Sequence, residues 1–420
     1  MLSRHPWRVL LVVAALAGLA VAAPHLWAWY HLRAARDAVL HYHHAEAREH
    51  LEKCLKVWPS SIEAHLLACR VARREGNFDE AQEHLRECQR AHPGPSEQIA
   101  LEWAMLRASM GDLEGVETYL LGQARGDPAR AALVFEALVE GYSSTYRVKD
   151  ALNCLERWFK QDPDNVRALA LRGNLWWSVH VPKNALPDYR RVVELDPDNG
   201  HARERLAQCL LEAGHFDEAL PLLTKLHGEK PDDPDWAARL ARCRNLLGQS
   251  REAREMLEAV LREHPDHGLT LRTLGQMALA DRKPAEAEKF LERAVRATPN
   301  DTQSQWSLYD ALHRQGKDEE AARQKKRAQD VEKRAERIAE IGGRLLANSP
   351  HDPALQCELG KLLLERGDFK VGAAWLRSAL KEDPNHRPAL EALAAYHEAR
   401  GEKELAQPYR QRLAESEPRP

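Results

Sequence analysis

Histidine and cysteine side chains gather near residues 41–54, and they are the first candidates for chemistry in this sequence. His41, His43, His44 and His50 lie within ten residues, and Cys54 follows His50 by four. Imidazole and thiolate groups four residues apart on a helix could chelate a transition metal. The alternative is a turn with exposed histidines and a Cys54 that packs as a small apolar side chain. We favour this second interpretation, so we expect no bound metal.

The remaining cysteines and the overall charge exclude several classes of protein. The chain has seven cysteines in 420 residues, without a Cys-x-x-Cys pair or a Cys/His zinc spacing, which argues against a disulfide scaffold and structural zinc. The net charge is −3, whereas a general nucleic-acid binder needs a basic excess. The sequence contains no P-loop, GxSxG, HExxH or GxGxxG motif. We therefore expect no enzyme activity, no cofactor, no small-molecule substrate and no nucleic-acid partner.

Prolines recur along the chain with a nearly constant period, and this period organises the elements that carry those side chains. The steps between the first eight are 34, 35, 35, 34, 34, 34 and 34 residues; a step of 51 then leads to three more prolines at intervals of 34. The positions are Pro59, Pro93, Pro128, Pro163, Pro197, Pro231, Pro265, Pro299, Pro350, Pro384 and Pro418. A fixed period of this length is typical of a repeat protein.

Small residues keep the same period, twelve residues before most of the prolines. They are Ala47, Ala81, Val116, Ala151, Ala185, Ala219, Ala253, Ala287, Ala321, Gly372 and Ala406. Each period predicts two amphipathic helices, because apolar residues recur at helical spacing and the proline ends the second helix. In the unit Val166–Pro197 we expect helices over 166–179 and 184–195. A small residue is needed where the two helices cross closely.

These features resemble the tetratricopeptide repeat family. Gly173, Trp176, Ala185, Tyr189 and Pro197 occupy the signature positions of the family in one repeat. The same positions hold Ala207, Leu210, Ala219, Leu223 and Pro231 in the next repeat, and Gly275, Ala278, Ala287, Leu291 and Pro299 further on. The resemblance covers about residues 31–418. It implies an all-α, right-handed superhelical solenoid of about ten or eleven stacked antiparallel helix pairs. Val116 and Val139 depart from the pattern.

The resemblance also implies a concave groove, lined mainly by the first helix of each repeat, that binds extended peptides or partner helices. Asn174 matches one position of the family's carboxylate clamp, but Ala170 stands where the clamp lysine would be, so we expect no recognition of chaperone tails. Arginine and tryptophan are common binding hot spots. The side chains expected to face the groove are Arg70, Arg73, Arg74, Asn174, Trp177, Arg242, Asn245, Arg272, Gln276, Trp306 and Arg314.

An insertion of 17 residues interrupts the period within residues 318–349. No terminator ends the second helix of that repeat, and the following residues are highly charged with both signs near balance. We predict an extended charged helix. It could be a projecting arm or a coiled-coil contact, but we favour a solvated helix placed between two stacks of repeats.

The N-terminal residues form a long apolar run. No charged residue occurs between Arg8 and Arg33, and Val9–Tyr30 would span roughly 33 Å as a helix, enough to cross a bilayer. Trp7 lies at one end and Trp27 near the other, as expected at membrane interfaces. The alternative is a cleaved signal peptide ending near Ala22. We predict a single-pass anchor of bacterial inner-membrane type, with the repeat domain outside the cytoplasm.

These predictions define five regions: a basic flank at 1–8, the anchor or signal peptide at 9–30, a tandem repeat array at 31–317, the charged helix at 318–349, and a C-terminal repeat pair at 350–420. The expected function is a membrane-tethered scaffold that binds other proteins or extended peptides in its groove. The alternatives are an exported soluble protein after signal cleavage, an accessory subunit that presents substrates to a partner enzyme, and a metal-binding sensor based on the histidines.

Overall fold

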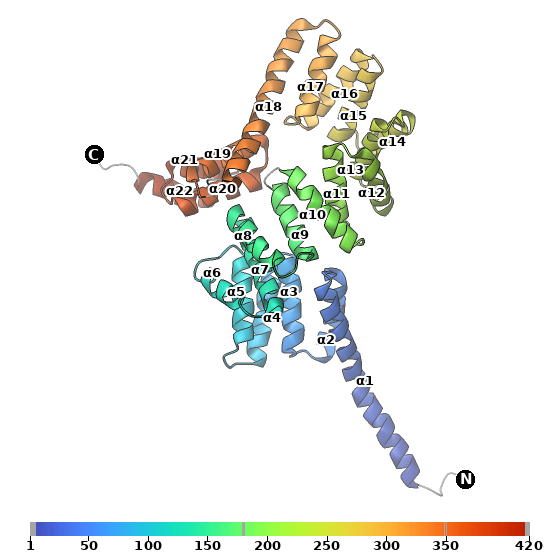
Figure 1. The fold of residues 1–420 in the computed structure, drawn as a ribbon, viewed down its shortest axis with the longest axis vertical. Helices are drawn as coiled ribbons and strands as arrows, with labels where there is room; N and C mark the ends of the chain where they lie inside the picture. The colour runs from blue at the N-terminus through green and yellow to red at the C-terminus, as the bar shows by residue number, and fades with distance from the viewer. Residues whose placement is uncertain (1–5, 179–180, 348, 350, 416–420) are drawn as a thin grey trace. The chain divides into compact units, whose positions relative to one another are not determined.

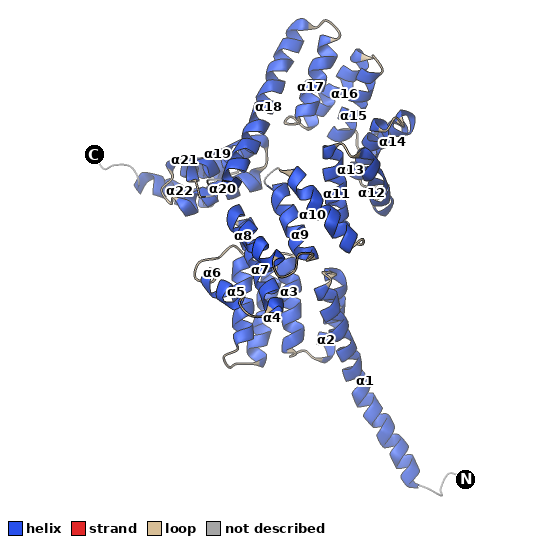
Figure 2. Ribbon diagram, viewed as in Figure 1, coloured by secondary structure: helices blue, strands red, loops and turns tan. Residues whose placement is uncertain are grey.

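The computed structural model describes residues 6–178, 181–347, 349 and 351–415; the side chains of 6–21 and 345–347 lie outside the description. Within these ranges the chain forms 22 helices and no strand (Figure 2). The chain divides into two compact units, Met1–Ser144 with Cys154–Gln161, and Thr145–Asn153 with Asp162–Pro420. We describe each unit separately, with the helix labels of Figure 1.

The first unit contains the N-terminal helices. They are α1 (Pro6–Leu40), α2 (His44–Val57), α3 (Ile62–Arg74), α4 (Phe78–Ala91), α5 (Glu97–Ser109), α6 (Glu117–Gln123) and α7 (Pro128–Ser144). Helix α8 (Val148–Phe159) contributes residues to both units.

The second unit contains the remaining helices. They are α9 (Val166–Ser178), α10 (Pro182–Leu195), α11 (Gly200–Ala213), α12 (Phe216–Glu229), α13 (Pro234–Leu246), α14 (Ser250–Glu263), α15 (Gly268–Ala280), α16 (Pro284–Ala297), α17 (Thr302–His313), α18 (Asp318–Ala347), α19 (Pro353–Arg366), α20 (Phe369–Glu382), α21 (Arg387–Ala399) and α22 (Lys403–Glu415).

Local sequence signals set the ends of these helices. At α11, the side chain of Asn199 accepts a hydrogen bond from the Ala202 N–H (3.0 Å), which satisfies a backbone donor that the helix leaves free. Gly214 ends the same helix in the left-handed conformation with φ of 81°, which a glycine adopts without steric cost. Helices α9 and α10 correspond closely to the pair predicted within Val166–Pro197; the end predicted at residue 179 lies outside the described residues.

Paired helices cross closely at the predicted small residues. A Cβ placed on Gly173 would lie 2.9 Å from the ring of Tyr189, and one on Gly275 would lie 2.5 Å from Cγ of Leu291. Ala219, on the second helix of its pair, is fully buried. The predicted close crossing is therefore confirmed at these pairs.

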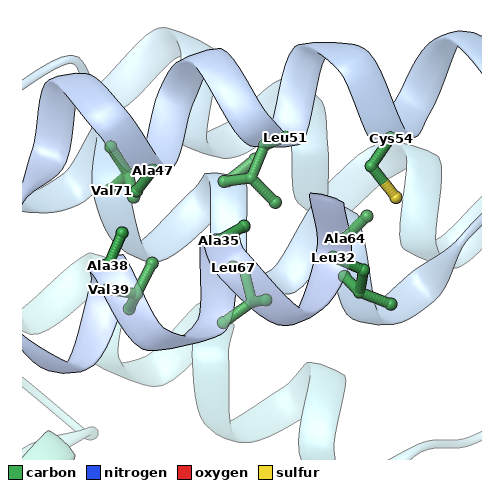
Figure 3. Packing of buried hydrophobic residues seen from close by; sticks show 11 residues of the cluster. Leu32, Ala35, Ala38, Val39, Ala47, Leu51, Cys54, Ala64, Leu67 and Val71 are labelled. Carbon is green, nitrogen blue, oxygen red and sulfur yellow. The ribbon is translucent and has the colours of Figure 1, made fainter. Parts of the chain in front are cut away.

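The first hairpin shows how a repeat joins its neighbour. The C-terminal half of α1 acts as the first helix of a repeat and packs on α2 and α3 (Figure 3). The buried side chains of this cluster are Leu32, Ala35, Ala38, Val39, Ala47, Leu51, Cys54, Ala64, Leu67, Ala68 and Val71. Ten of them are labelled in Figure 3, where they point into one layer between the helices.

The repeat that departs from the sequence pattern also departs in structure. Helix α6, which begins just after Val116, has only seven residues. Helix α7 instead packs directly against α5, so closely that a Cβ on Gly141 would lie 2.1 Å from the carbonyl oxygen of Ala108. Val139 lies fully buried in α7. The short helix leaves room for this direct contact.

Helix α18 spans the predicted charged region and has 30 residues, about 45 Å of helix. Its first part pairs with α17, where Gln324 donates to the Gln305 carbonyl (3.0 Å), and its later part contacts α19. Arg337 forms a two-pronged ion pair with Glu358 of α19 (2.7 and 2.8 Å). The helix thus packs on a neighbour near both ends, and Ile341 is fully buried.

In the part of the chain that the structure describes, no helix is long and apolar enough to cross a membrane. This finding gives no support to the transmembrane helix predicted at residues 9–30. The structure does include these residues in α1, but the side chains of 9–21 lie outside its description.

Candidate functional site

The first helices of the repeats form the inner layer of the second unit. Consecutive first helices contact each other directly, α13 with α15 and α15 with α17. In the described residues, no comparable contact joins α12 to α14 or α14 to α16. The closely spaced layer of a curved stack is its concave side, so α13, α15 and α17 line the groove. Helices α9 and α11 are the first helices of the preceding repeats and continue this layer through side-chain contacts such as that of Trp177 with Arg205.

The structure places the predicted groove residues of the second unit on these helices. All are half-buried except Arg314, which is exposed. They are Asn174 and Trp177 on α9, Arg242 and Asn245 on α13, Arg272 and Gln276 on α15, Trp306 on α17, and Arg314 directly after α17.

Helices α10 and α11 hold the groove side chains of α9 in place. The side-chain oxygen of Asn174 accepts a hydrogen bond from the Tyr189 hydroxyl (2.7 Å) and lies 3.1 Å from Nε2 of His201. The guanidinium of Arg205 lies 4.9 Å from the centre of the Trp177 ring, a cation–π distance. Both α9 side chains are therefore positioned before any partner binds.

At the other end of the groove, polar side chains bind one another. Arg272 donates to Asp301 (2.6 Å), and the Gln276 amide donates to Ser307 (3.3 Å). Arg314 donates to the carbonyl of Leu279 (3.0 Å) and pairs with a neighbouring aspartate. Because these side chains already make internal hydrogen bonds, they have fewer donor groups left with which to bind a partner.

The centre of the groove has unused capacity. Among the described side chains, neither Arg242 nor Asn245 has a hydrogen-bonding partner or an ion pair. Burial lowers the pKa of Arg242, and the positive charges of Arg272 and Arg239 lower it further. Asp301 and Glu212 raise this pKa, by less than the other groups lower it. The positive charge of Arg242 is therefore less well stabilised in the groove than it would be in water.

Two further arginines, which were not among the predicted groove residues, belong to this surface. Arg205 and Arg239 occupy the same position in consecutive repeats, 34 residues apart, so the period itself could have identified them. The guanidinium of Arg239 lies 5.7 Å from the ring of Trp236, and its Nε is buried without a hydrogen-bond partner in the described chain. We call Arg205, Arg239, Arg242 and Arg272 the arginine row.

The three predicted groove residues of the first unit are engaged internally. Arg70 donates to Glu102 (2.6 Å), and Arg74 forms a two-pronged ion pair with Glu136 (2.9 and 2.8 Å). Both carboxylates are 1% exposed, and Arg73 between them is 2% exposed. The expectation that Arg73 faces an open groove is wrong, because its side chain lies inside an ionic network.

The network extends to a third inner helix. Arg73 donates to the hydroxyl of Ser109 (2.9 Å) and to the carboxylate of Glu140 (2.7 Å). Paired arginines and glutamates thus join α3, α5 and α7 on their inner side. The charged side chains on this surface of the first unit pair with one another, so few of them are available to bind a partner.

The histidines of the first hairpin contact nearby side chains and backbone. No group of three or more histidine, cysteine or acidic side chains with the geometry for a metal ion occurs among the described residues. His50 instead faces His31, with their Nδ1 atoms 2.6 Å apart. His41 hydrogen-bonds the carbonyl of Asp37 (2.9 Å). His43 and His44 lie at the start of α2.

All seven cysteines are free thiols and are buried. They are Cys54, Cys69, Cys88, Cys154, Cys209, Cys243 and Cys357. Burial raises the pKa of Cys88 to about 11 and that of Cys69 to about 12. The thiols therefore act as small apolar core side chains, as the sequence predicted.

Comparison with protein families agrees with this architecture. One family model, described as tetratricopeptide repeat, matches residues 39–110, 182–243 and 210–274. A second model of the same description matches residues 247–302, 343–387 and 357–418. Together the matches cover more than half of the sequence, and the chain belongs to the tetratricopeptide repeat family. It is therefore a helical solenoid of a class suited to binding proteins or peptides.

Solved structures resemble the chain only distantly. One is the "crystal structure of YrrB: a TPR protein with an unusual peptide-binding site", 18% identical over 46% of this chain and 96% of that chain, with a TM-score of 0.38. Another is the human IFIT1 dimer with PPP-AAAA, 19% identical over 84% and 90%, with a TM-score of 0.34. A third, MamA, is 16% identical over 40% and 92%, with a TM-score of 0.30. No curated protein matches the sequence.

Proposed function

We propose that this protein is a non-enzymatic scaffold that holds an extended segment of another protein in the groove of its second unit. The observation that carries this proposal is the centre of the groove on α13, where Arg242 and Asn245 are half-buried and have no partner among the described side chains. Half-buried polar groups without partners are costly unless a bound molecule supplies the missing contacts.

The arrangement suits an extended chain better than a compact ligand. The polar and aromatic side chains lie on successive inner helices rather than around one enclosed cavity. Trp177 offers a large apolar surface and Asn245 an amide that binds backbone groups. An extended segment that crosses several helices can contact all of them in turn.

The N-terminal region supports a further part of the proposal, attachment of this scaffold to a membrane with the repeats outside the cytoplasm. The sequence run Val9–Tyr30 carries no charged side chain. Where the structure describes α1, Trp27, Trp29 and Tyr30 are 44–60% exposed. Exposed aromatic side chains next to an apolar run are typical of the interface between a bilayer and water.

Removal of two groove side chains tests the binding function. The double substitution Trp177→Ala with Arg242→Ala should weaken capture of the partner by about 2–4 kcal/mol, because each is a hot-spot type of side chain. Affinity purification of the full-length chain, followed by mass spectrometry, measures which proteins are retained. The matched control is Arg251→Ala on α14, whose side chain is 89% exposed.

The fold of both variants is checked by circular dichroism and thermal melting, since neither replaced groove residue lies at a helix crossing. If the folded double variant retains the same proteins as the control in equal amounts, the groove is not the binding surface and the proposal fails.

Membrane attachment is tested with the whole chain and a charged variant of the apolar run. The wild type should stay in the membrane pellet after a carbonate wash, and Leu11→Lys with Leu16→Lys should move it to the supernatant. Release of a mature form that begins near Ala23 would show cleavage instead. A truncation at Arg33 is unsuitable, because it would remove Ala28 and Leu32 from the core of the first hairpin.

A further inference from the structure

We infer that the segment held in this groove is acidic, with carboxylates spaced about three residues apart that bind the arginine row Arg205, Arg239, Arg242 and Arg272. This inference rests on the proposed function and specifies the chemistry of its partner. It is carried by the arginines of α11 and α13 that have no ion pair in the described chain, by the excess of positive charge on α13, and by the direct packing of α13 on α15.

The positive charges of the arginine row are poorly balanced by the protein itself. Among the described residues, Arg272 alone of the four has an ion pair, with Asp301 at 2.6 Å. Arg205 donates to the uncharged amide of Gln208 (3.3 Å) and lies over a tryptophan ring. In the described chain, Arg239 and Arg242 have no ion pair, although all four side chains of the row are half-buried.

The acidic side chains nearest to the centre of the row do not neutralise it. Burial raises the pKa of Glu212, which disfavours its charged form, although Arg239 and Arg242 oppose this shift. Asp235 accepts a hydrogen bond from His267 (3.2 Å) and interacts electrostatically with Arg239, without a close ion pair in the described chain. Asp301 favours the charge of Arg242 but is already paired with Arg272. The centre therefore stays electropositive and partly withdrawn from water.

A carboxylate is the complement of this site. A guanidinium presents two parallel N–H groups to the two oxygens of a carboxylate, and such charge-assisted pairs are stronger than neutral hydrogen bonds. Burial, and then the positive charges of Arg272 and Arg239, lower the pKa of Arg242, and an incoming anion would offset both effects. A bound carboxylate would thus reduce the repulsion between these like charges, and this reduction would favour binding.

The distance between packed inner helices determines which spacing of carboxylates along the bound segment fits the arginine row. Packed helices lie about 8–10 Å apart. An extended segment in the polyproline II conformation advances about 3.1 Å per residue, so every third side chain lies about 9 Å further on the same side. Glutamate or aspartate at every third position would therefore meet arginines of α13 and α15, which pack on each other. Arg205 occupies the position on α11 that Arg239 occupies on α13.

A protein segment fits these observations better than RNA, whose phosphates would also be attracted to the row. The chain as a whole carries a net charge of −3 and lacks the basic excess with which a general RNA binder neutralises many successive phosphates. Arg205 occupies one face of the Trp177 ring, and Trp236 is 5% exposed, so the row offers no series of open rings on which successive bases could stack. RNA is therefore included in the test as the competing ligand.

The test measures fluorescence anisotropy of labelled 13-residue peptides with the full-length chain in detergent. One peptide has glutamate at every third position with alanine and leucine between, a second has glutamine in place of every glutamate, and a third groups all glutamates together. Since one charged hydrogen bond is worth about 1.5–3 kcal/mol, the spaced glutamate peptide should bind at least tenfold more tightly than the glutamine peptide. It should also bind more tightly than the grouped peptide.

Two variants assign the effect to the row. Arg239→Gln with Arg242→Gln should reduce binding of the spaced glutamate peptide at least tenfold, whereas Arg251→Gln on the outer helix α14 should leave it unchanged. Equal affinity for the glutamate and glutamine peptides would overturn the inference. So would tighter binding of a 13-nucleotide oligouridine, or an equal loss in the Arg251→Gln variant.

The outcomes separate this inference from the proposed function. If the glutamate and glutamine peptides bind equally and Trp177→Ala weakens both, the groove still binds peptides but does not select acidic ones. If no peptide binds, the acidic segment is ruled out, and the capture experiment with the Trp177→Ala, Arg242→Ala variant decides the proposed function independently.

Discussion

Replacing Gly275 by alanine adds one methyl group at the point where α15 crosses α16 most closely. The new Cβ would lie 2.5 Å from Cγ and 2.7 Å from Cδ2 of Leu291, which is fully buried. Carbon atoms prefer separations of about 3.5–4.0 Å, so the leucine or the helices must move. Alanine gains about 1 kcal/mol in helix propensity over glycine, whereas overpacking of this severity costs about 3 kcal/mol. We expect a net loss of about 2 kcal/mol.

A second glycine gives the matched control. Gly343 also lies inside a helix, α18, but a Cβ there would have no atom within 4 Å. The same substitution, Gly343→Ala, should therefore stabilise its helix by about 1 kcal/mol through propensity alone. Both substitutions gain the same helix propensity, so the opposite signs of their changes in stability would come only from the packing where α15 crosses α16.

Hydrogen exchange measured by mass spectrometry reports these changes locally, because repeats interact mainly with their neighbours. In Gly275→Ala, exchange in α15 and α16 should accelerate about 30-fold, the equivalent of 2 kcal/mol. The double variant with Leu291→Ala should be less destabilised than the sum of the single variants, because the added methyl enters the space that the leucine leaves. Additive losses, or faster exchange in Gly343→Ala, would refute the reasoning.

Three other predictions follow from local features. Arg282 adopts a positive φ of 59° at the turn where most repeats have glycine, so Arg282→Gly should raise the melting temperature by an amount equivalent to about 0.5–1 kcal/mol, while Arg282→Ala should not. Glu136→Ala should destabilise the first unit by about 3–5 kcal/mol in chemical denaturation, because it leaves the buried guanidinium of Arg73 without part of its balancing charge. Burial raises the pKa of Cys69 and Cys209 to about 12, so the folded chain keeps these thiols protonated at a pH where the unfolded chain ionises them. The free energy of unfolding should therefore fall as the pH rises from about 8.5 towards 12. In urea titrations this decrease should be smaller when both cysteines are replaced by alanine.

The helices were predictable because their signals are local and repeated. A proline follows most second helices, and a small residue marks most crossings, so the imperfect copies reinforce one pattern. Gly173 and Tyr189 illustrate this, since their positions in the repeat alone indicate that they meet. The short α6 was not predicted, because Val116 signals only a departure from the pattern and not what replaces it.

The state of the groove side chains was less predictable, because it depends on charges from other repeats. Arg74 was correctly assigned to a first helix, but its partner Glu136 lies 62 residues further along the chain. Arg242 occupies a similar kind of position, yet its neighbours in space include two more arginines. The sequence pattern shows that such a position faces inward, whereas pairing depends on which side chains the neighbouring repeats supply.

The continuity of α1 has a mechanical consequence. Leu26 and Trp27 are exposed, whereas Leu32 and Val39 on the same uninterrupted helix are packed in the first hairpin. A pull on the N-terminal end of this helix acts along its axis, parallel to the antiparallel interface with α2. Such a load shears all the contacts of the interface together instead of peeling them apart one by one. Tension applied to the described part of α1 therefore passes directly into the first hairpin.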